Sequence, residues 1–231
     1  LTSHPEFGHD TKATEVADAF PSQIKDRIVA ITGISRGGLG GATALAIARQ
    51  SPALLILIFR TQSKLDEVIS DIKSINSTVP VKAVVVDLAW QASVRKAAEE
   101  IKSLASHIDL LINNAGLHLN KRSHSPEGIE TQLAANHVGP FLLTNLLTDQ
   151  LLAAAKRSPP GATRVVNVSS VVHRSSPFRF HDHNSEGWPV PADEVGTVYL
   201  YPKFLKKPVD GYVGVQTYSH TKTANILFTV C

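Results

Sequence analysis

Short apolar runs alternate with longer amphipathic stretches along the whole chain. The apolar runs are β-branched or Leu-rich with few polar breaks, as expected for strands that are covered on both faces. The longer stretches, such as SVRKAAEEIKSLA, carry apolar residues at the three- and four-residue spacing of a helix. This alternation predicts β-α-β units, and therefore an α/β fold with a doubly wound parallel sheet and helices on both faces. The predicted strands cover 27–32, 53–59, 81–87, 108–113 and 163–169, and the predicted helices lie near 40–50, 63–75, 91–105, 126–155 and 217–231.

One domain is expected over residues 24–231, after an N-terminal extension of residues 1–23. The 231 residues are enough for a substantial core, and no repeat or linker divides them. The irregular region at about 173–216 is rich in Pro, Gly, His and aromatic residues. We expect it to be a long insertion on the surface of the domain. Long loops of this kind are usually functional or mobile.

Composition and charge narrow the classes of function. The net charge is +3, but Lys and Arg are scattered singly or in pairs, so nucleic-acid binding is not expected. The only cysteine, Cys231, excludes an internal disulfide and a Cys-based zinc site. The first twenty residues lack the apolar centre of a signal peptide, and the longest apolar run, 53–59, is far shorter than the ~20 residues of a membrane helix. The sequence therefore predicts a cytoplasmic protein with no membrane segment.

A glycine-rich turn follows the first predicted strand. Residues 32–48, TGISRGGLGGATALAIA, lead from that strand into an Ala-rich helix. Glycines at such a turn let the backbone approach a pyrophosphate at the positive N-terminus of the helix. A tight packing turn without a ligand is the alternative, but the position between strand and helix favours dinucleotide binding.

With this turn the chain resembles the short-chain dehydrogenase/reductase family, which typically shows Thr-Gly-x-x-x-Gly-x-Gly here and has a Rossmann-like fold. This chain has one residue more after Gly33. Gly38 and Gly40 fit the pattern better than Gly37, which would put Leu39 at the third glycine position. The individual contacts of residues 35–37 stay open. The resemblance implies cofactor binding by Gly33, Ser35, Arg36, Gly38, Leu39 and Gly40.

Arg60 follows the second predicted strand, where an NAD enzyme usually has an acidic residue on the adenosine ribose. A guanidinium group can pair with a 2′-phosphate, which a carboxylate would repel. Arg36 in the glycine turn could add a second positive charge. The sequence therefore predicts NADP(H) as the cofactor, and a solvated arginine without a ligand is the alternative for Arg60.

Two further motifs follow predicted strands at their carboxyl ends, where an open α/β sheet holds its ligand. VVVDLA places Asp87 and Leu88 after the third strand, and LINNAG places Asn114, Ala115 and Gly116 after the fourth. By resemblance, Asp87 with Leu88 contacts the adenine, and Asn114 to Gly116 line the adenosine ribose. A strand-terminating turn would explain the Asn-Gly pattern if it stood alone.

The sequence contains Tyr-x-x-x-Lys twice, and the two side chains can meet only if the segment is helical. Pro202 lies between Tyr199 and Lys203 and would break a helix there. No such residue interrupts the segment of Tyr218 and Lys222. The second copy is therefore predicted to be the functional pair. A lysine cation about 4–5 Å from the phenol is expected to lower the tyrosine pKa from ~10 by at most two to three units.

The resemblance assigns roles to a tetrad of residues. It implies that Tyr218 is the general acid/base and that Lys222 supports it and binds the nicotinamide ribose. VVNVSS supplies Ser169 and Ser170 at the end of the fifth strand, and alternation along a strand lets only one of them face a given side. By resemblance Ser170 is the catalytic serine, which hydrogen-bonds the reacting oxygen, and Asn136 anchors a water beside the lysine.

Ser170 and Tyr218 are separated by 47 residues, and the insertion between them is expected to shape substrate access. Its His173, His181 and His183 have neither the spacing nor the Cys or carboxylate partners of a metal site. We expect them to be exposed to solvent, and no metal is predicted.

Taken together, the motifs predict an NADP(H)-dependent oxidoreductase that interconverts a small-molecule carbonyl and an alcohol. RVVNVSS and YSHTKTANILFT are similar to retinol-dehydrogenase-like members of the family. A non-catalytic NADP(H)-binding protein on the same fold is an alternative. Because the chain has no methionine, and because the last strands of the family do not follow Cys231, an inactive fragment is another. The resemblance also implies a homodimer contact along the helix that carries Tyr218.

Overall fold

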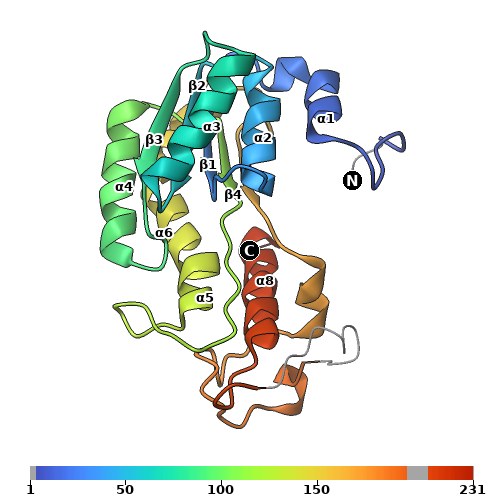
Figure 1. Cartoon of the computed structure of the whole chain (residues 1–231), viewed down its shortest axis with the longest axis vertical. Helices are drawn as coiled ribbons and strands as arrows, with labels where there is room; N and C mark the ends of the chain where they lie inside the picture. The colour runs from blue at the N-terminus through green and yellow to red at the C-terminus, as the bar shows by residue number, and fades with distance from the viewer. Residues whose placement is uncertain (1–3, 197–207, 231) are drawn as a thin grey trace. The chain divides into compact units, whose positions relative to one another are not determined.

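The computed structural model of the chain describes residues 4–196 and 208–230 (Figure 1). Its contacts divide the chain into two compact units, each assembled from separate segments. The first unit comprises residues 1–85, 100–114 and 149–165, and the second comprises 86–99, 115–148 and 166–231. The single domain expected over 24–231 stays a prediction.

A five-stranded sheet forms the framework of the fold. Its strands are β1 (Ile28–Thr32), β2 (Leu54–Phe59), β3 (Val81–Val85), β4 (Leu110–Asn113) and β5 (Arg164–Asn167). The order is β3-β2-β1-β4-β5, and β1 pairs in parallel with both β2 and β4. The direction of strand succession therefore reverses at β1, and such a switch point is where open α/β sheets bind ligands. The predicted α/β fold with a parallel sheet is confirmed.

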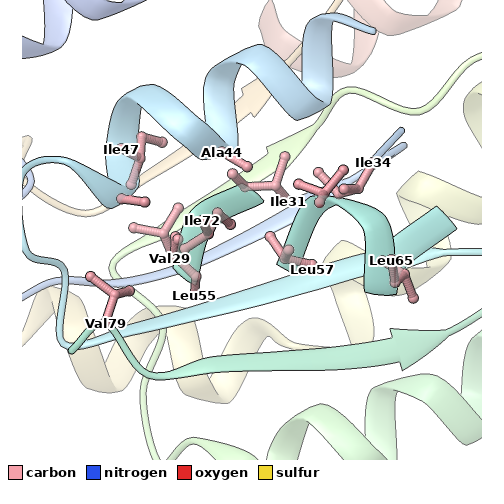
Figure 2. Packing of buried hydrophobic residues seen from close by; sticks show 12 residues of the cluster. Val29, Ile31, Ile34, Ala44, Ile47, Leu55, Leu57, Leu65, Ile72 and Val79 are labelled. Atoms are coloured by element: carbon pink, nitrogen blue, oxygen red, sulfur yellow. The ribbon is translucent and has the colours of Figure 1, made fainter. Parts of the chain in front are cut away.

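The core of the first unit packs two helices against β1 and β2. Figure 2 shows Val29, Ile31, Leu55 and Leu57 of these strands with Ala44 of α2 (Leu39–Ala48) and further apolar residues of α3 (Gln62–Ile75). All residues from Leu55 to Leu57 are fully buried, although consecutive side chains of a strand point to opposite faces. Both faces of β2 are therefore covered, which explains why its sequence is continuously apolar.

The predicted helix over 126–155 is wrong as one element. It begins later and is divided by a π-helical turn, η2 (Ala134–Val138), and by Leu147, whose φ of −99° and ψ of 9° end a helix. Its parts are α5 (Thr131–Leu133), α6 (Gly139–Leu146) and α7 (Thr148–Ala155). The predicted helices near 91–105 and 217–231 exist as α4 (Gln91–Leu104) and α8 (Gly214–Val230), and α8 begins three residues earlier than expected.

The N-terminal extension has local structure that the apolar periodicity did not predict. It contains the short helix α1 (Ala13–Ala19), in which Asp18 pairs with Arg49 at 3.5 Å.

The third and fifth strands end two residues earlier than predicted, at Val85 and Asn167. Among the described residues, no helix has both the length and the apolar character needed to cross a bilayer.

The insertion is tied to its own unit by buried polar contacts. Asn184 Oδ1 accepts from the amide of Glu130, and Thr217 Oγ1 of α8 donates to Ser185 Oγ at 2.9 Å. Where the insertion returns, the fully buried Tyr212 donates its hydroxyl to Glu130 Oε1 at 2.8 Å. These contacts fix the start of α8. Short 3-10 turns lie at η3 (Val171–Ser175) and η4 (Ala192–Glu194), and a further one, η1, lies at Pro21–Gln23.

A buried carboxylate joins the amino ends of β1 and β4. Asp109 is only 4% exposed, and its oxygens accept from the backbone amide of Ile28 at 2.8 Å and from Arg27 Nη1 at 3.1 Å. Its backbone carbonyl accepts from the amide of Arg164, the first residue of β5. Asp109 therefore connects three strands of the sheet.

Replacing Asp109 by Ala should lower the free energy of unfolding by about 3 kcal/mol, because the Ile28 amide loses its acceptor and the Arg27 guanidinium, which still donates to Ser158 Oγ, loses its carboxylate. Urea unfolding measures the change. The exposed Asp10→Ala variant is the control and should stay within about 0.5 kcal/mol of the wild type. Equal stability of both variants would contradict this account of the sheet.

Candidate active site

The glycine turn of the first unit has the backbone geometry that the pattern predicted. Gly33 and Gly37 adopt φ values of +80° and +76°, which L side chains rarely adopt. A Cβ atom on Gly40 would lie 2.4 Å from the carbonyl oxygen of Gly33, so only glycine fits there. Gly38 is the N-cap of α2, and no side chain caps that helix. The turn therefore presents an open helix N-terminus, which suits a pyrophosphate.

Asn114 supports this turn from β4. Its side-chain amide donates to the carbonyl oxygens of Thr32 at 2.9 Å and of Gly33 at 3.2 Å, and its backbone amide donates to Thr32 Oγ1. The side chain predicted to line the adenosine ribose is thus engaged with the glycine turn. Asn114 acts by holding the ends of β1 and β4 together at the switch point.

The two predicted 2′-phosphate residues differ in their surroundings. Arg36 belongs to the glycine turn, and its Nε and Nη2 atoms donate to the carboxylate of Asp71 on α3 at 2.8 and 2.6 Å. This ion pair raises the pKa of Arg36 and lowers that of Asp71. Arg60 is exposed just beyond β2. The positive charge of Arg36 is therefore partly neutralised, and Arg60 is the more accessible cation for an added phosphate.

Asp87 and Leu88 lie in the second unit, just past the end of β3. Asp87 Oδ1 accepts from the amide of Ala89 at 2.9 Å, and its own amide donates to Ser93 Oγ. The carbonyl oxygen of Leu88 packs so closely on α6 that a Cβ at Gly139 would lie 2.1 Å from it. This turn is shaped by local hydrogen bonds and packs against Gly139 of α6.

The predicted Tyr/Lys pair lies on one face of α8. Lys222 Nζ is 5.6 Å from the centroid of the Tyr218 ring and donates to the backbone carbonyl of Val168 at 3.0 Å. Lys222 is only 2% exposed, whereas Tyr218 is half-buried. No ion pair between described residues involves Lys222. The other copy, Tyr199 and Lys203, lies outside the described residues.

Burial decides the pKa values of this pair. It lowers the pKa of Lys222 to about 8 and raises the pKa of Tyr218 above its ordinary value. The expectation that Lys222 would lower the tyrosine pKa is therefore wrong for this arrangement. The reason is that both groups lose solvent, which penalises the charged form of each.

Asn136 lies in the π-helical turn η2 and is completely buried. Its Oδ1 accepts from the amide of Leu117 at 2.8 Å, and its Nδ2 donates to the carbonyl of Leu117 and to Thr221 Oγ1. A Cβ at Gly116 would lie 3.2 Å from Lys222 Nζ and 3.7 Å from Asn136 Oδ1. Asn136 and Lys222 thus both lie close to the backbone at Gly116, and their roles in catalysis stay predictions.

Ser169 and Ser170 lie beyond the end of β5 rather than on it. Ser169 Oγ donates to the backbone carbonyl of Lys222 at 2.8 Å, which engages it with α8. Ser170 is the N-cap of η3, and its Oγ accepts from the amide of Val172 at 3.4 Å. The Ser170 hydroxyl hydrogen is not used by this contact, so the choice of Ser170 over Ser169 is compatible with the local geometry.

His118 is a neighbour of the site that sequence reasoning missed. Its ring lies edge-on to Tyr218, with centroids 5.7 Å apart and an interplanar angle of 88°. It lies two residues after Gly116, and this closeness to a motif was the available signal. Thr221, inside the Tyr-x-x-x-Lys segment, was also missed as the partner of Asn136.

The histidines of the insertion follow the prediction only in part. His181 and His183 are exposed, and His181 Nδ1 lies 2.8 Å from Glu194 Oε1. His173 is half-buried instead, because its Nδ1 hydrogen-bonds the backbone carbonyl of Ser170 at 2.7 Å. Over the described ranges 4–196 and 208–230, no group of three or more His, Cys, Asp or Glu side chains could hold a metal ion.

Comparison with known proteins places these features in a family. The sequence model of the short chain dehydrogenase family matches residues 27–181. Oxidoreductase fscI of Fusarium equiseti is 41% identical over 177 residues, which cover 76% of this chain and 68% of that protein. Retinol dehydrogenase 12 of Bos taurus is 36% identical over 210 residues, covering 90% of this chain and 56% of the relative. The chain thus spans about two thirds of the first relative and just over half of the second.

A solved structure shares the fold of this chain. A crystal structure of a protein from Mycobacterium paratuberculosis has a TM-score of 0.65 and 28% sequence identity, and the similarity covers 90% of this chain and 61% of that one. The resemblance drawn from the glycine turn and the Tyr/Lys pair is confirmed. The chain therefore belongs to the short chain dehydrogenase family.

Proposed function

We propose that this protein is an NADP(H)-dependent oxidoreductase that interconverts a carbonyl and an alcohol, with Tyr218 as the general acid/base. The observation that carries the proposal is the buried Lys222 ammonium group, 5.6 Å from the Tyr218 ring and without an ion-pair partner among the described residues. Burying an unpaired cation is costly, so its retention beside a phenol points to chemistry rather than stability.

The residues of the first unit fit the phosphates of the cofactor. The uncapped N-terminus of α2 would hold the pyrophosphate. Because Gly40 has no side chain, the backbone there could come close to the pyrophosphate. Arg60 would bind the 2′-phosphate, with Arg36 contributing less because of its pairing with Asp71. In the second unit Asp87 and Leu88 would contact the adenine.

Four residues of the second unit would carry the reaction. When bound, NADP(H) supplies or accepts the hydride. Ser170 Oγ would donate a hydrogen bond to the carbonyl oxygen of the substrate, and Tyr218 Oη would give it the proton that completes the alcohol. Lys222, whose Nζ lies close to Gly116, would bind the nicotinamide ribose. Asn136 would fix the backbone next to Gly116 by its hydrogen bond with Leu117.

The raised pKa of Tyr218 favours reduction near neutral pH. A phenol whose pKa lies above its ordinary value is protonated at pH 7, and this is the form that donates. Alcohol oxidation needs the phenolate as proton acceptor, so it should accelerate as the pH rises. A non-catalytic NADP(H)-binding protein is the second candidate, because the tyrosine is not acidified. A homodimer and a cytoplasmic location stay predictions.

Replacing Tyr218 by Phe should lower kcat for carbonyl reduction by about a thousandfold, because the proton donor is lost while the ring remains. NADPH oxidation with a panel of ketones and aldehydes measures this, and NADPH binding should change less than about threefold. Tyr199→Phe, in the other Tyr-x-x-x-Lys copy, is the matched control. Unchanged turnover in Tyr218→Phe, or NADPH binding without turnover of any substrate by the wild type, would contradict the proposed function.

Arg60→Ala should weaken NADPH binding by about 10- to 100-fold, the effect of losing a charge-assisted hydrogen bond to a phosphate. NADH binding should not change, and Arg36→Ala should have a smaller effect than Arg60→Ala. Fluorescence titration of the bound nicotinamide gives both dissociation constants. Arg49→Ala is the control, since Arg49 pairs with Asp18 at a distance from this turn in the sequence. An equal loss of NADH and NADPH binding would refute the role of Arg60.

Lys222→Met should stabilise the protein by roughly 1–3 kcal/mol at pH 7 while reducing turnover. The pKa of Lys222 is about 8 in the folded protein and 10.5 in a free lysine, so the unfolded chain binds the proton more tightly and the full cost to stability is present below pH 8. The cost fades as the pH rises from 8 towards 10.5. The difference in unfolding free energy between variant and wild type should therefore be smaller at pH 10 than at pH 7. Destabilisation by Lys222→Met at pH 7 would mean that the lysine is a structural residue.

A further inference from the structure

Two polar contacts join the π-helical turn η2 to α8, and Lys222 lies between them. Asn136 Nδ2 donates to Thr221 Oγ1 at 3.1 Å, and one residue further His137 Nδ1 lies 3.1 Å from Asn225 Oδ1. Thr221 and Asn225 are four residues apart, so they share a face of α8. Consecutive residues of the turn therefore bind two positions one helical turn apart, on either side of Lys222 in sequence.

Asn225 also contacts the acceptor of the lysine. Its Nδ2 donates to the backbone carbonyl of Val168 at 3.4 Å, and the same carbonyl accepts from Lys222 Nζ at 3.0 Å. Val168 lies just beyond the end of β5, so regular strand pairing does not fix it. The next residue, Ser169, is tied to the carbonyl of Lys222. Side-chain contacts with α8 therefore decide where the Val168 carbonyl lies.

His137 sets the orientation of the Asn225 amide. Because Asn225 Oδ1 accepts from His137, the NH₂ group of the amide is directed to Val168. A reversed amide would place its oxygen against the carbonyl of Val168, which is unfavourable for two buried acceptors. Asn225 is 6% exposed, and burial lowers the pKa of the His137 imidazole, which keeps it neutral. The contact between them is thus a neutral hydrogen bond with one favoured direction.

We propose that His137 and Asn225 are positioning residues that hold the Val168 carbonyl against the ammonium group of Lys222. The inference rests on the proposed catalytic role of Lys222, and it adds a supporting pair that acts through the backbone of Val168. His137 has a second possible role, because its ring also packs near Phe141 and Phe228, with centroids 6.2 and 6.1 Å away. The experiment must separate hydrogen bonding from packing.

Two variants of His137 make this separation. His137→Phe keeps an aromatic ring but removes the donor to Asn225. His137→Asn removes the ring, while its amide nitrogen can take the place of Nδ1 as donor. Asn225→Leu removes the amide itself, so the test does not depend on one substitution. Phe141→Leu is the packing control, since it changes the aromatic contact of His137 and no hydrogen bond of the pair.

The measurement is the pKa of Lys222, from NMR of the Nζ signal in protein with ¹⁵N-labelled lysine. Lys222→Met identifies that signal by its absence. Tyr218, whose ring centroid is 5.6 Å away, titrates above its ordinary range, and the buried His220 titrates at about 3, so neither obscures the transition of Lys222 at about 8. The signal reports on the ammonium group directly and does not require turnover.

We expect the pKa of Lys222 to fall by about one unit in His137→Phe and Asn225→Leu, because the ammonium group loses a fixed acceptor. His137→Asn and Phe141→Leu should stay within about 0.3 units of the wild type. Equal shifts in His137→Phe and His137→Asn, or no shift in the first and in Asn225→Leu, would overturn the proposal. If the shifts occur but the wild type reduces no carbonyl, the proposed function fails while the positioning role stands.

Discussion

The second unit is organised around a single contact, the hydrogen bond from the Lys222 ammonium group to the backbone carbonyl of Val168. The lysine is almost completely buried, and burial alone is enough to lower its pKa to about 8. A cation in such a place needs acceptors that cannot move away, since each one lost makes ionisation less favourable. The unit supplies the carbonyl of Val168 from the segment after β5, and the backbone of Gly116 lies close to the ammonium group. Much of the surrounding structure can be understood as the means of keeping this arrangement in place.

The helix that carries Lys222 is held at several points along its length. Near its start, Thr217 contacts Ser185 of the insertion, and Tyr212 just before it binds Glu130. In its middle, Thr221 accepts from Asn136. Ser185 and Tyr212 belong to the insertion and Asn136 belongs to a π-helical turn, and regular α/β units have neither feature. π-helical turns are uncommon and occur frequently at functional sites, because the extra residue changes which side chains face a neighbour. Here the turn lets two consecutive residues, Asn136 and His137, both reach α8.

The sequence was sufficient for the features that depend on local patterns. Mainly apolar runs located the five strands, and the runs of β1 and β2 are continuous because both faces of these two strands are buried. Pro202 favoured Tyr218 and Lys222 over the other Tyr-x-x-x-Lys copy, and this choice stays a prediction. The division of residues 126–155 could not be predicted, since η2 is stabilised by contacts of Asn136 with Leu117 and Thr221, which lie 19 and 85 residues away. The pKa values could not be predicted either. The spacing placed a lysine beside a phenol, but only the burial of both groups shows that loss of solvent outweighs the attraction between their charged forms.

Burial reverses the order of ionisation that two free side chains would show. A free tyrosine at ~10 loses its proton slightly before a free lysine at ~10.4. In this protein the lysine is the weaker base at about 8, and the tyrosine is a weaker acid than usual. Between these values the phenol keeps its proton while the amine can lose one. The site is therefore poised to donate a proton from Tyr218, and any group that stabilises the ammonium form, such as the Val168 carbonyl, increases the attraction for a phenolate that forms in the reaction. The acceptors of Lys222 thus keep the ammonium group in place beside the phenol, while the burial of Tyr218 sets its acidity.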